Sequence, residues 1–270
     1  MIITFIGGGN MAGALVGGLS ESSGDHLIRV ADPDAEVRSA LEADYGVDTF
    51  EDGKDAIPGA DVVVLAIKPQ ITPRVMASLG AHLSSRQLLL SVAAGITLKA
   101  LHGWIGAEVP AVRTMPNAPA LLGLGVTGLY ADERCTEAHR AQADLVMSAC
   151  GETVWVKEEQ QLDAVTAVSG SGPAYYFLFT EALAAAGESL GLPPDTARTL
   201  AVHTARGAGV MAAETGGDVV DLRRRVTSPR GTTAAAIECF EKGGLRTLVQ
   251  EATEAAARRS RELATGGNES

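Results

Sequence analysis

A glycine-rich segment near the start of the chain has the residue types and spacing of a dinucleotide-binding loop. Gly7, Gly9 and Ala12 fit the pattern G-x-G-x-x-G/A, between an apolar run, Ile2–Ile6, and a segment of helical character, Met11–Ser20. Gly7 would form the tight turn, and Gly9 would let the backbone approach a pyrophosphate. The helix N-terminus would offer N–H groups and the positive end of its dipole. The pattern predicts a dinucleotide site; a glycine-rich turn that binds no ligand is the alternative.

Asp32 directly follows the second expected strand, Leu27–Ala31. An acidic side chain at this place can accept a hydrogen bond from the adenosine ribose, which favours NADH and repels a 2′-phosphate. With Pro33 and Glu36 after it, Asp32 would also make a good helix N-cap with proline at the first helical position. The two roles can coexist.

Two more groups stand at the ends of expected strands, where small residues would let a cofactor approach. Ala66-Ile67-Lys68-Pro69 ends the strongest buried-strand pattern, Asp61–Ile67, and Ala93-Ala94-Gly95 follows the strand Leu88–Val92. Lys68 could contact a phosphate or the substrate, or could be a solvated turn residue.

Two later loops also have a composition suited to ligands. Ser169–Pro173 (SGSGP) precedes an apolar helix and could present N–H groups or hydroxyls, or could serve as a flexible joint. Val226–Thr233 (VTSPRGTT) leads into another helix, and its hydroxyls and free N–H groups suit a substrate carboxylate. Thr232 could instead cap that helix without any ligand.

The order of these elements predicts the fold class. Short apolar runs alternate with helical patterns up to about Lys157, which predicts an α/β fold with a Rossmann-type, doubly wound, mostly parallel sheet and ligands at the carboxyl ends of its strands. After that point only helical patterns follow. We therefore predict a dinucleotide-binding domain over residues 1–157 and an all-helical substrate and dimerisation domain over residues 158–270. The apolar faces of so few helices need a second copy to cover them.

Composition excludes several classes of protein. Hydrophobic residues make up 46% and charged residues 20% of the 270 residues, so the chain is not disordered. The net charge of −11 disfavours nucleic acid as a partner. Its three cysteines have no metal-ligand spacing, so no metal site is expected. A glycine triplet interrupts the charge-free start, which predicts neither a signal peptide nor a membrane span, and favours a cytoplasmic protein.

The histidines fall outside all of these motifs, which bears on the chemistry. Reduction of a ketone usually requires a positioned proton donor, and Tyr175 and Lys68 are the only candidates near the motifs. A cyclic iminium substrate already carries its proton, so the protein needs only to place the carbon against a nicotinamide and hold the other end of the substrate.

Six segments together resemble the pyrroline-5-carboxylate reductases: IGGGNMA, AIKP, VAAG, RTMPNAP, DAVTAVSGSGPAY and VTSPRGTT, in this order from about residue 2 to residue 263. The resemblance implies reduction of 1-pyrroline-5-carboxylate to L-proline by hydride transfer from NADPH or NADH, the final step of proline biosynthesis. It also implies homodimers, which in this family often form rings of five dimers.

The resemblance also implies roles for individual residues. Thr233 would bond the pyrroline nitrogen as the catalytic residue, with Ser228 and the backbone of Thr232 around the carboxylate, and Met115–Asn117 would lie near the nicotinamide. The residues implied in cofactor binding are Ile6, Gly7, Gly8, Gly9, Asn10, Met11, Ala66, Ile67, Lys68, Pro69, Ala93, Ala94 and Gly95.

The chain departs from the family pattern at two places. Arg230-Gly231 stands where the family usually has two glycines, which places a positive charge beside an anion site. Asp32-Pro33 stands where many members have Asn-Arg, so an arginine partner for the 2′-phosphate is missing and the choice between NADH and NADPH stays open.

Two other functions compete with the reductase. A β-hydroxyacid dehydrogenase would need a catalytic lysine on an early helix of its second domain, and Gly172–Leu190 has none. A nicotinamide-binding regulatory protein without turnover would need no carboxylate pocket.

Overall fold

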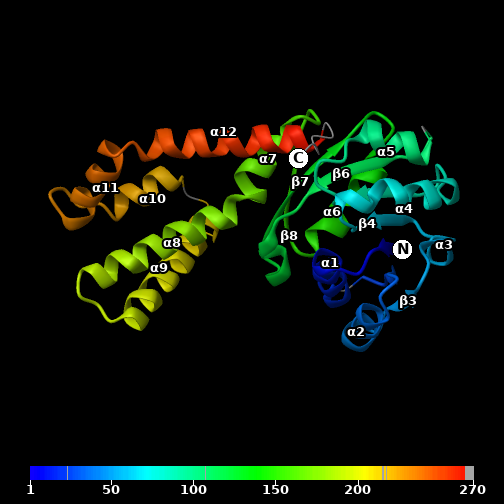
Figure 1. The fold of residues 1–270 in the computed structure, drawn as a ribbon, viewed down its shortest axis with the longest axis horizontal. Coiled ribbons are helices and arrows are strands. Elements are labelled where there is room, and N and C mark those ends of the chain that lie inside the picture. Colours follow the sequence, from blue (N-terminus) through cyan, green and yellow to red (C-terminus); the bar gives the residue numbers. More distant parts are fainter. Residues whose placement is uncertain (23, 107, 215, 217, 265–270) are drawn as a thin grey trace. The chain divides into compact units, whose positions relative to one another are not determined.

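The computed structural model describes residues 1–264 except 23, 107, 215 and 217. Its contacts divide the chain into two compact units (Figure 1). The first unit holds Met1–Ser171 together with the described residues from Ala256 onward, and the second holds Gly172–Ala255.

The first unit is built on an eight-stranded sheet with the order β3-β2-β1-β4-β5-β6-β7-β8. Every neighbouring pair is parallel except β6 and β7. The order runs outward from β1 in two directions, so the sheet has its switch point between β1 and β4. The strands are β1 Ile2–Ile6, β2 Leu27–Ala31, β3 Asp48–Phe50, β4 Val62–Leu65, β5 Leu88–Ser91, β6 Ala111–Met115, β7 Gly125–Ala131 and β8 Gly151–Trp155.

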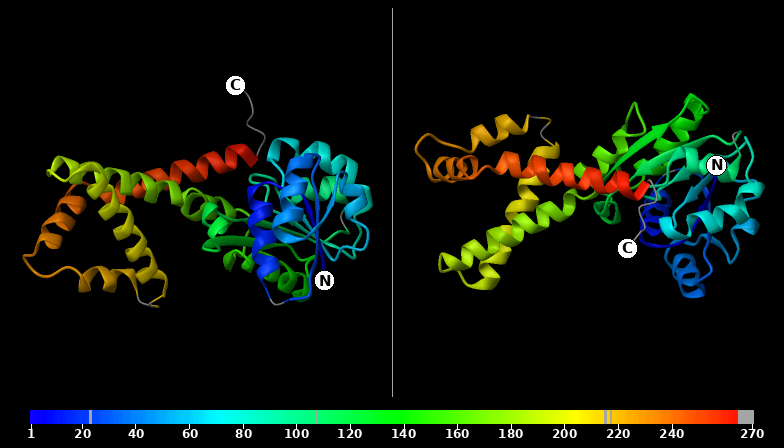
Figure 2. Two further views of the ribbon diagram at one scale, coloured as in Figure 1. Left: turned by 90° about the horizontal axis from the view of Figure 1, so that it is seen from below. Right: turned by 45° about the horizontal axis from the view of Figure 1, so that its top comes forward.

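Helices cover both faces of this sheet (Figures 1 and 2). Because side chains alternate along a strand, Val64 packs with Leu15 of α1 in one core cluster, whereas Val63 packs with Met76 of α4 in the other. Burial on both faces explains why the central strands are apolar throughout. The helices are α1 Asn10–Glu21, α2 Ala35–Tyr45, α3 Gly53–Ala56, α4 Thr72–Leu79, α5 Leu98–Ile105, α6 Glu137–Ser148 and α7 Gln161–Val165, with short 3₁₀ turns at Pro69–Ile71, Gly80–His82 and Ala118–Leu122.

The predicted doubly wound, mostly parallel sheet is thus confirmed, with some local differences. The edge strand β3 and the helices α3 and α5 were not predicted. The helix after β2 begins at Ala35 rather than at Pro33, and its N-cap is Asp34, whose carboxylate accepts a hydrogen bond from the N–H of Glu36. The N-cap role considered for Asp32 is therefore wrong.

The first unit continues past the predicted boundary at residue 157. Leu162 of α7 is buried, and α7 packs on β6 and β7 before a π-helical turn, Thr166–Gly170, ends the segment. Asp163 accepts a hydrogen bond of 2.6 Å from the hydroxyl of Ser260, which also belongs to this unit. The division of functions between residues 1–157 and 158–270 stays a prediction.

The second unit contains only helices among its described residues. The pair α8 (Gly172–Ser189) and α9 (Pro194–Glu214) packs closely, and α10 (Val219–Arg225), α11 (Thr232–Lys242) and the start of α12 (Leu245–Ala264) follow. Large apolar side chains stay exposed in this single chain, Tyr176, Phe177, Leu178, Leu190 and Leu248 among them. None of the helices in the described part of the chain is long and apolar enough to cross a membrane.

Candidate active site

The carboxyl ends of β1, β2, β4 and β5 meet at one edge of the sheet. Strand pairing sets Ile6 level with Ala31 on one side and with Leu65 on the other, and sets Leu65 level with Ser91. The segments that follow these strands are the ones predicted to bind the cofactor: Ile6–Met11, Asp32, Ala66–Pro69 and Ala93–Gly95. The structure therefore brings the four predicted groups together at the switch point.

Gly7 forms the turn at the end of β1. Its φ of +97° lies in the region that favours glycine, and its N–H donates to the carbonyl of Ala31 at 2.8 Å. A Cβ on this residue would lie 2.5 Å from the carbonyl oxygen of Ala66. Glycine is thus required here because the loop passes directly against the end of β4.

Gly9 has the opposite environment. A Cβ built on it would meet nothing within 4 Å, and the residue is the N-cap of α1. No side chain of the described residues caps this helix, so the N–H groups of its first turn are available to a ligand. Asn10 is exposed, Met11 is half-buried and Ala12 is fully buried, which places the first turn of α1 against the sheet with its N-terminus open. These residues fit a dinucleotide pyrophosphate.

Asp32 links the glycine loop to the turn after β2. One carboxylate oxygen accepts from the N–H of Gly8 at 2.8 Å, and the other accepts from the N–H of Asp34 at 2.9 Å. Sequence reasoning missed the contact with Gly8. The pairing of β1 with β2 was the signal that could have found it, because paired parallel strands release their following loops side by side.

The remaining residues predicted to bind the cofactor differ in exposure. Lys68 is exposed and stands at the N-cap of a 3₁₀ turn, Pro69–Ile71. Ala93 is buried, Ala94 is exposed and Gly95 turns the chain with a φ of +76°. A Cβ on Gly95 would lie 3.5 Å from the backbone nitrogen of Ala264, so the end of α12 packs beside this loop within the first unit.

Asn117 joins two motifs that the sequence presented separately. Its amide nitrogen donates to the carbonyl of Ser169 at 3.1 Å, and its amide oxygen accepts from the N–H of Val126 at 3.0 Å. A Cβ on Gly170 would lie 2.6 Å from the terminal methyl group of Met115. The segment Thr166–Gly170 is π-helical, a distortion frequent at functional sites. Met115–Asn117 and the first part of SGSGP thus form one packed region.

A partly buried ion pair, also missed from the sequence, fixes the start of α5. Glu159 accepts from the guanidinium of Arg113 at 2.6 Å and from the N–H of Leu98 at 2.8 Å. Burial raises the pKa of neighbouring Tyr130, and the carboxylates of Glu159 and Asp132 raise it further, so this phenol stays protonated at neutral pH. Leu98 begins the helix that follows Ala93–Gly95, so Glu159 ties the chain just after this predicted cofactor loop to Arg113 of β6.

The predicted substrate residues lie in the second unit. In the turn Ser228-Pro229-Arg230-Gly231, the N–H of Gly231 donates to the carbonyl of Ser228 at 3.0 Å, and Arg230 has a φ of +61°. Helix α11 then begins at Thr232 with Gly231 as its N-cap and without a side-chain cap from the described residues. The capping role considered for Thr232 is therefore wrong, and Thr232 and Thr233 expose the first turn of α11.

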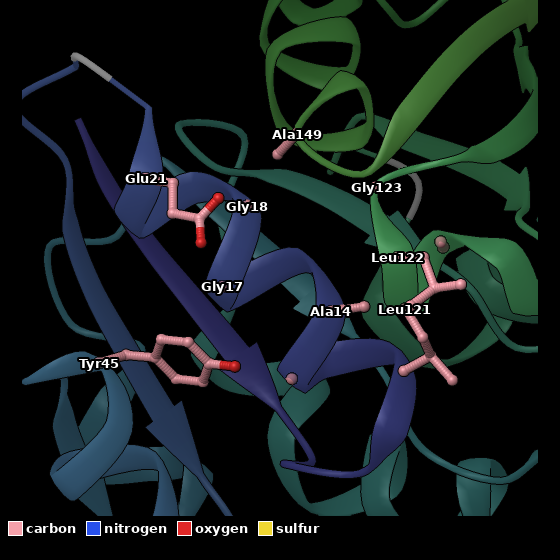
Figure 3. A pocket seen from close by; sticks show the side chains of 11 residues that line it. Ala14, Gly17, Gly18, Glu21, Tyr45, Leu121, Leu122, Gly123 and Ala149 are labelled. Atoms are coloured by element: carbon pink, nitrogen blue, oxygen red, sulfur yellow. The ribbon is translucent and has the colours of Figure 1, made fainter.

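A surface hollow of about 330 Å³ lies beside α1 (Figure 3). Gly17 and Gly18 line it, together with Tyr45, Leu121 and Leu122. A Cβ on Gly17 would lie 3.1 Å from the hydroxyl of Tyr45, so glycine lets α2 approach α1. None of the predicted site residues lines this hollow.

Two of the three cysteines, Cys135 and Cys150, are buried, whereas Cys239 is exposed. Within the described ranges, no group of three or more His, Cys, Asp or Glu side chains is placed to hold a metal ion. Burial raises the pKa of the Cys135 thiol to about 11, and it also raises the pKa of Cys150, so both thiols stay protonated at neutral pH.

Comparison with known proteins identifies related chains. The family model described as "Pyrroline-5-carboxylate reductase dimerisation" matches residues 159–263, and the model described as "NADP oxidoreductase coenzyme F420-dependent" matches residues 2–95. The pyrroline-5-carboxylate reductase of Pseudomonas aeruginosa is 48% identical over 97% of this chain and 96% of its own. That of Haemophilus influenzae is 41% identical over 98% of each chain.

Solved structures agree with these matches. A pyrroline-5-carboxylate reductase from Coxiella burnetii superposes with a TM-score of 0.94 at 42% identity, covering 97% of this chain and 98% of that one. A Plasmodium falciparum pyrroline carboxylate reductase, crystallised with NADP bound, gives a TM-score of 0.82 at 27% identity over 98% of each chain. The resemblance indicated by the sequence motifs is confirmed: the chain belongs to the pyrroline-5-carboxylate reductase family.

Proposed function

We propose that this chain reduces 1-pyrroline-5-carboxylate to L-proline with NADPH or NADH, the final step of proline biosynthesis. The observation that carries the proposal is the convergence of Gly7, Asp32, Ala66–Pro69 and Ala93–Gly95 at the sheet's switch point, in a chain 48% identical to a curated reductase along nearly its whole length. The fold supports the cofactor part of the proposal, because its sheet edge suits a dinucleotide. Membership of the reductase family supports the choice of substrate.

The cofactor supplies the hydride, and the first unit supplies its binding site. Amides of the loop Ile6–Met11 and of the first turn of α1 would receive the pyrophosphate. Ala66–Pro69 and Ala93–Gly95 would flank the cofactor at the neighbouring strand ends, and Asp32 would lie at the ribose. Met115–Asn117, held to Ser169 by the amide of Asn117, would border the nicotinamide.

The second unit would hold the substrate. The uncapped first turn of α11 offers N–H groups and a positive dipole end to a carboxylate, and Ser228 stands one turn of chain before it. The hydroxyl oxygen of Thr233 would accept a hydrogen bond from the protonated ring nitrogen as the catalytic residue. Since a protonated imine already carries its proton, these groups need only orient the ring, and orientation by itself can supply much of the rate enhancement.

The chain carries the dimerisation region of its family, and we propose that it works as a homodimer, with a decamer of five dimers as the larger assembly to be tested. The exposed apolar side chains of the second unit support association, because water disfavours so many uncovered aromatic and aliphatic groups. Light scattering should give a mass well above 27.8 kDa; an active, monodisperse monomer would contradict the proposal.

We place the protein in the cytoplasm, in accord with its sequence.

The decisive test follows nicotinamide absorbance while pyrroline-5-carboxylate is supplied with NADH or NADPH in turn. We expect consumption of reduced cofactor with proline as the product. Cofactor binding without consumption would instead support the regulatory protein considered above.

A further inference from the structure

Two charged residues are joined by a hydrogen bond just beyond the end of β2, where this kind of fold places the adenosine ribose of a dinucleotide. Asp32 is the first, and Arg38 of α2 is the second. The guanidinium of Arg38 reaches back along its helix and donates from Nη1 to the backbone carbonyl of Asp32 at 2.7 Å. Arg38 is half-buried, so its charge is held close to the strand end rather than free in solvent.

The carboxylate of Asp32 is already engaged by the protein. Its two oxygens accept from the N–H groups of Gly8 and Asp34, at 2.8 and 2.9 Å. Two amide dipoles thus stabilise its negative charge and orient it toward the glycine loop. This weakens the repulsion that an acidic residue at this place would otherwise exert on a 2′-phosphate.

We propose that Arg38 is the specificity-determining residue for the adenosine end of the cofactor, with its guanidinium pairing with the 2′-phosphate of NADPH. The sequence showed no arginine beside Asp32, but a helical side chain several positions further along reaches the same turn. One nitrogen fixes the group to Asp32, and the rest of its planar fork keeps N–H donors for phosphate oxygens. The proposal rests on the dinucleotide site of the proposed function.

Other charges near the turn set the expected size of the effect. Asp34 and Glu36 are exposed, and Asp34 already caps α2 by accepting from the N–H of Glu36. Salt screens exposed charges, whereas a half-buried guanidinium acts over a short distance in a medium of lower polarity. We therefore expect the chain to use both cofactors, with Arg38 deciding how well NADPH competes.

Calorimetric titration of the full-length protein with 2′,5′-ADP and with 5′-AMP tests this directly, because the two probes differ only in the 2′-phosphate. Arg38→Ala should weaken 2′,5′-ADP binding about tenfold, equivalent to ~1.4 kcal/mol, and should change 5′-AMP binding by less than about twofold. Arg38→Lys should retain part of the difference, since it keeps the charge without the planar fork. Arg74→Ala, at an exposed position on α4, is the matched control and should change neither.

Steady-state kinetics give a second measurement. For Arg38→Ala the KM for NADPH should rise about tenfold while the KM for NADH stays within about twofold. Loss of the hydrogen bond to Asp32 should lower Tm by no more than about 4 °C, so the variant stays folded at the assay temperature. If Arg38→Ala loses equal affinity for both nucleotide probes, the residue is purely structural. If its affinity for 2′,5′-ADP is unchanged, another group binds the 2′-phosphate. Either result overturns the proposal. Because the nucleotide probes report only on the cofactor site, this result stands apart from a failure to reduce pyrroline-5-carboxylate.

Discussion

The glycine loop Gly7–Gly9 of the first unit and the proposed substrate turn Ser228–Gly231 of the second unit each precede a helix, yet their surroundings differ. The loop Gly7–Gly9 is held by hydrogen bonds to β2 and to Asp32, and it packs directly on the end of β4. The first three residues of the turn Ser228–Gly231 are exposed and Gly231 is half-buried. The turn closes through the backbone hydrogen bond from Gly231 to Ser228 and holds Arg230 in a conformation that favours glycine.

This difference separates a preorganised site from one that is only partly organised. At the glycine loop, the fold alone fixes the geometry before a cofactor arrives, so binding loses little conformational entropy. At the substrate turn, the apolar surroundings of the second unit are uncovered in a single chain, so a second copy and the substrate should contribute to its order. Substitutions in the two loops should therefore affect different properties.

The largest effect is expected at Gly7. Gly7→Ala should lower the free energy of unfolding by about 2–4 kcal/mol, because a Cβ conflicts with the carbonyl of Ala66 and the positive φ is unfavourable for alanine. Denaturant unfolding at a fixed protein concentration measures this change in the free energy of unfolding. Gly9→Ala is the matched control: its Cβ has free space, so stability should stay nearly unchanged while affinity for both cofactors falls. Equal stability of the two variants would mean that the fold does not fix the loop.

Thr233 should show the next largest effect, on catalysis rather than on stability. Thr233→Ala should lower kcat/KM for pyrroline-5-carboxylate by about 1–3 kcal/mol of transition-state stabilisation, the range for a hydrogen bond to a charged group. Cofactor affinity should be unchanged. Thr232→Ala serves as the control, because the proposal uses only the backbone of Thr232. If the two variants lose activity equally, Thr233 has no special role.

Asp32→Asn should have a smaller effect on both cofactors. The single side-chain oxygen of asparagine can replace only one of the two carboxylate oxygens that accept from the N–H groups of Gly8 and Asp34. The glycine loop should therefore be less ordered, and the free energy of unfolding should fall by about 1 kcal/mol. Loss of the negative charge should also shift the ratio of kcat/KM values toward NADPH. Asp34→Asn, which alters the cap of α2 instead, should leave that ratio unchanged. A constant ratio in Asp32→Asn would remove Asp32 from cofactor choice.

The smallest effect is expected at Arg230. Arg230→Gly should raise the free energy of unfolding by about 0.5–1 kcal/mol, because the strain of the left-handed conformation exceeds the extra entropy that glycine brings to the unfolded chain. Arg230→Asn, which tolerates this conformation, should act in the same direction. Denaturant unfolding at one protomer concentration checks both. A loss of stability in both variants would show that the arginine side chain itself holds the turn.

Much of the fold was predictable because its signals are local. The buried run Val62–Leu65 and the glycine loop each carry their pattern within a few residues, and the alternation of such runs with helices fixes the layer order of a doubly wound sheet. Short elements such as α3 and β3 escaped prediction because a few residues give no usable periodicity. The caps at Asp34 and Gly231 differed by one or two positions from those considered, since several neighbouring residues could serve and packing chose among them.

The sequence by itself determined which residues can do chemistry here: glycines that allow a close turn, threonines before a helix, and motifs shared with a reductase family. Only the tertiary structure decided which groups act on one another. Asp32 bonds Gly8 across 24 positions, Glu159 bonds Arg113 across 46, Asn117 bonds Ser169 across 52, and Arg38 turns back to the carbonyl of Asp32. The first three partnerships depend on strand order and register, which follow from burying the whole sheet at once, so no local pattern encodes them. The last joins residues six positions apart and depends on where α2 begins.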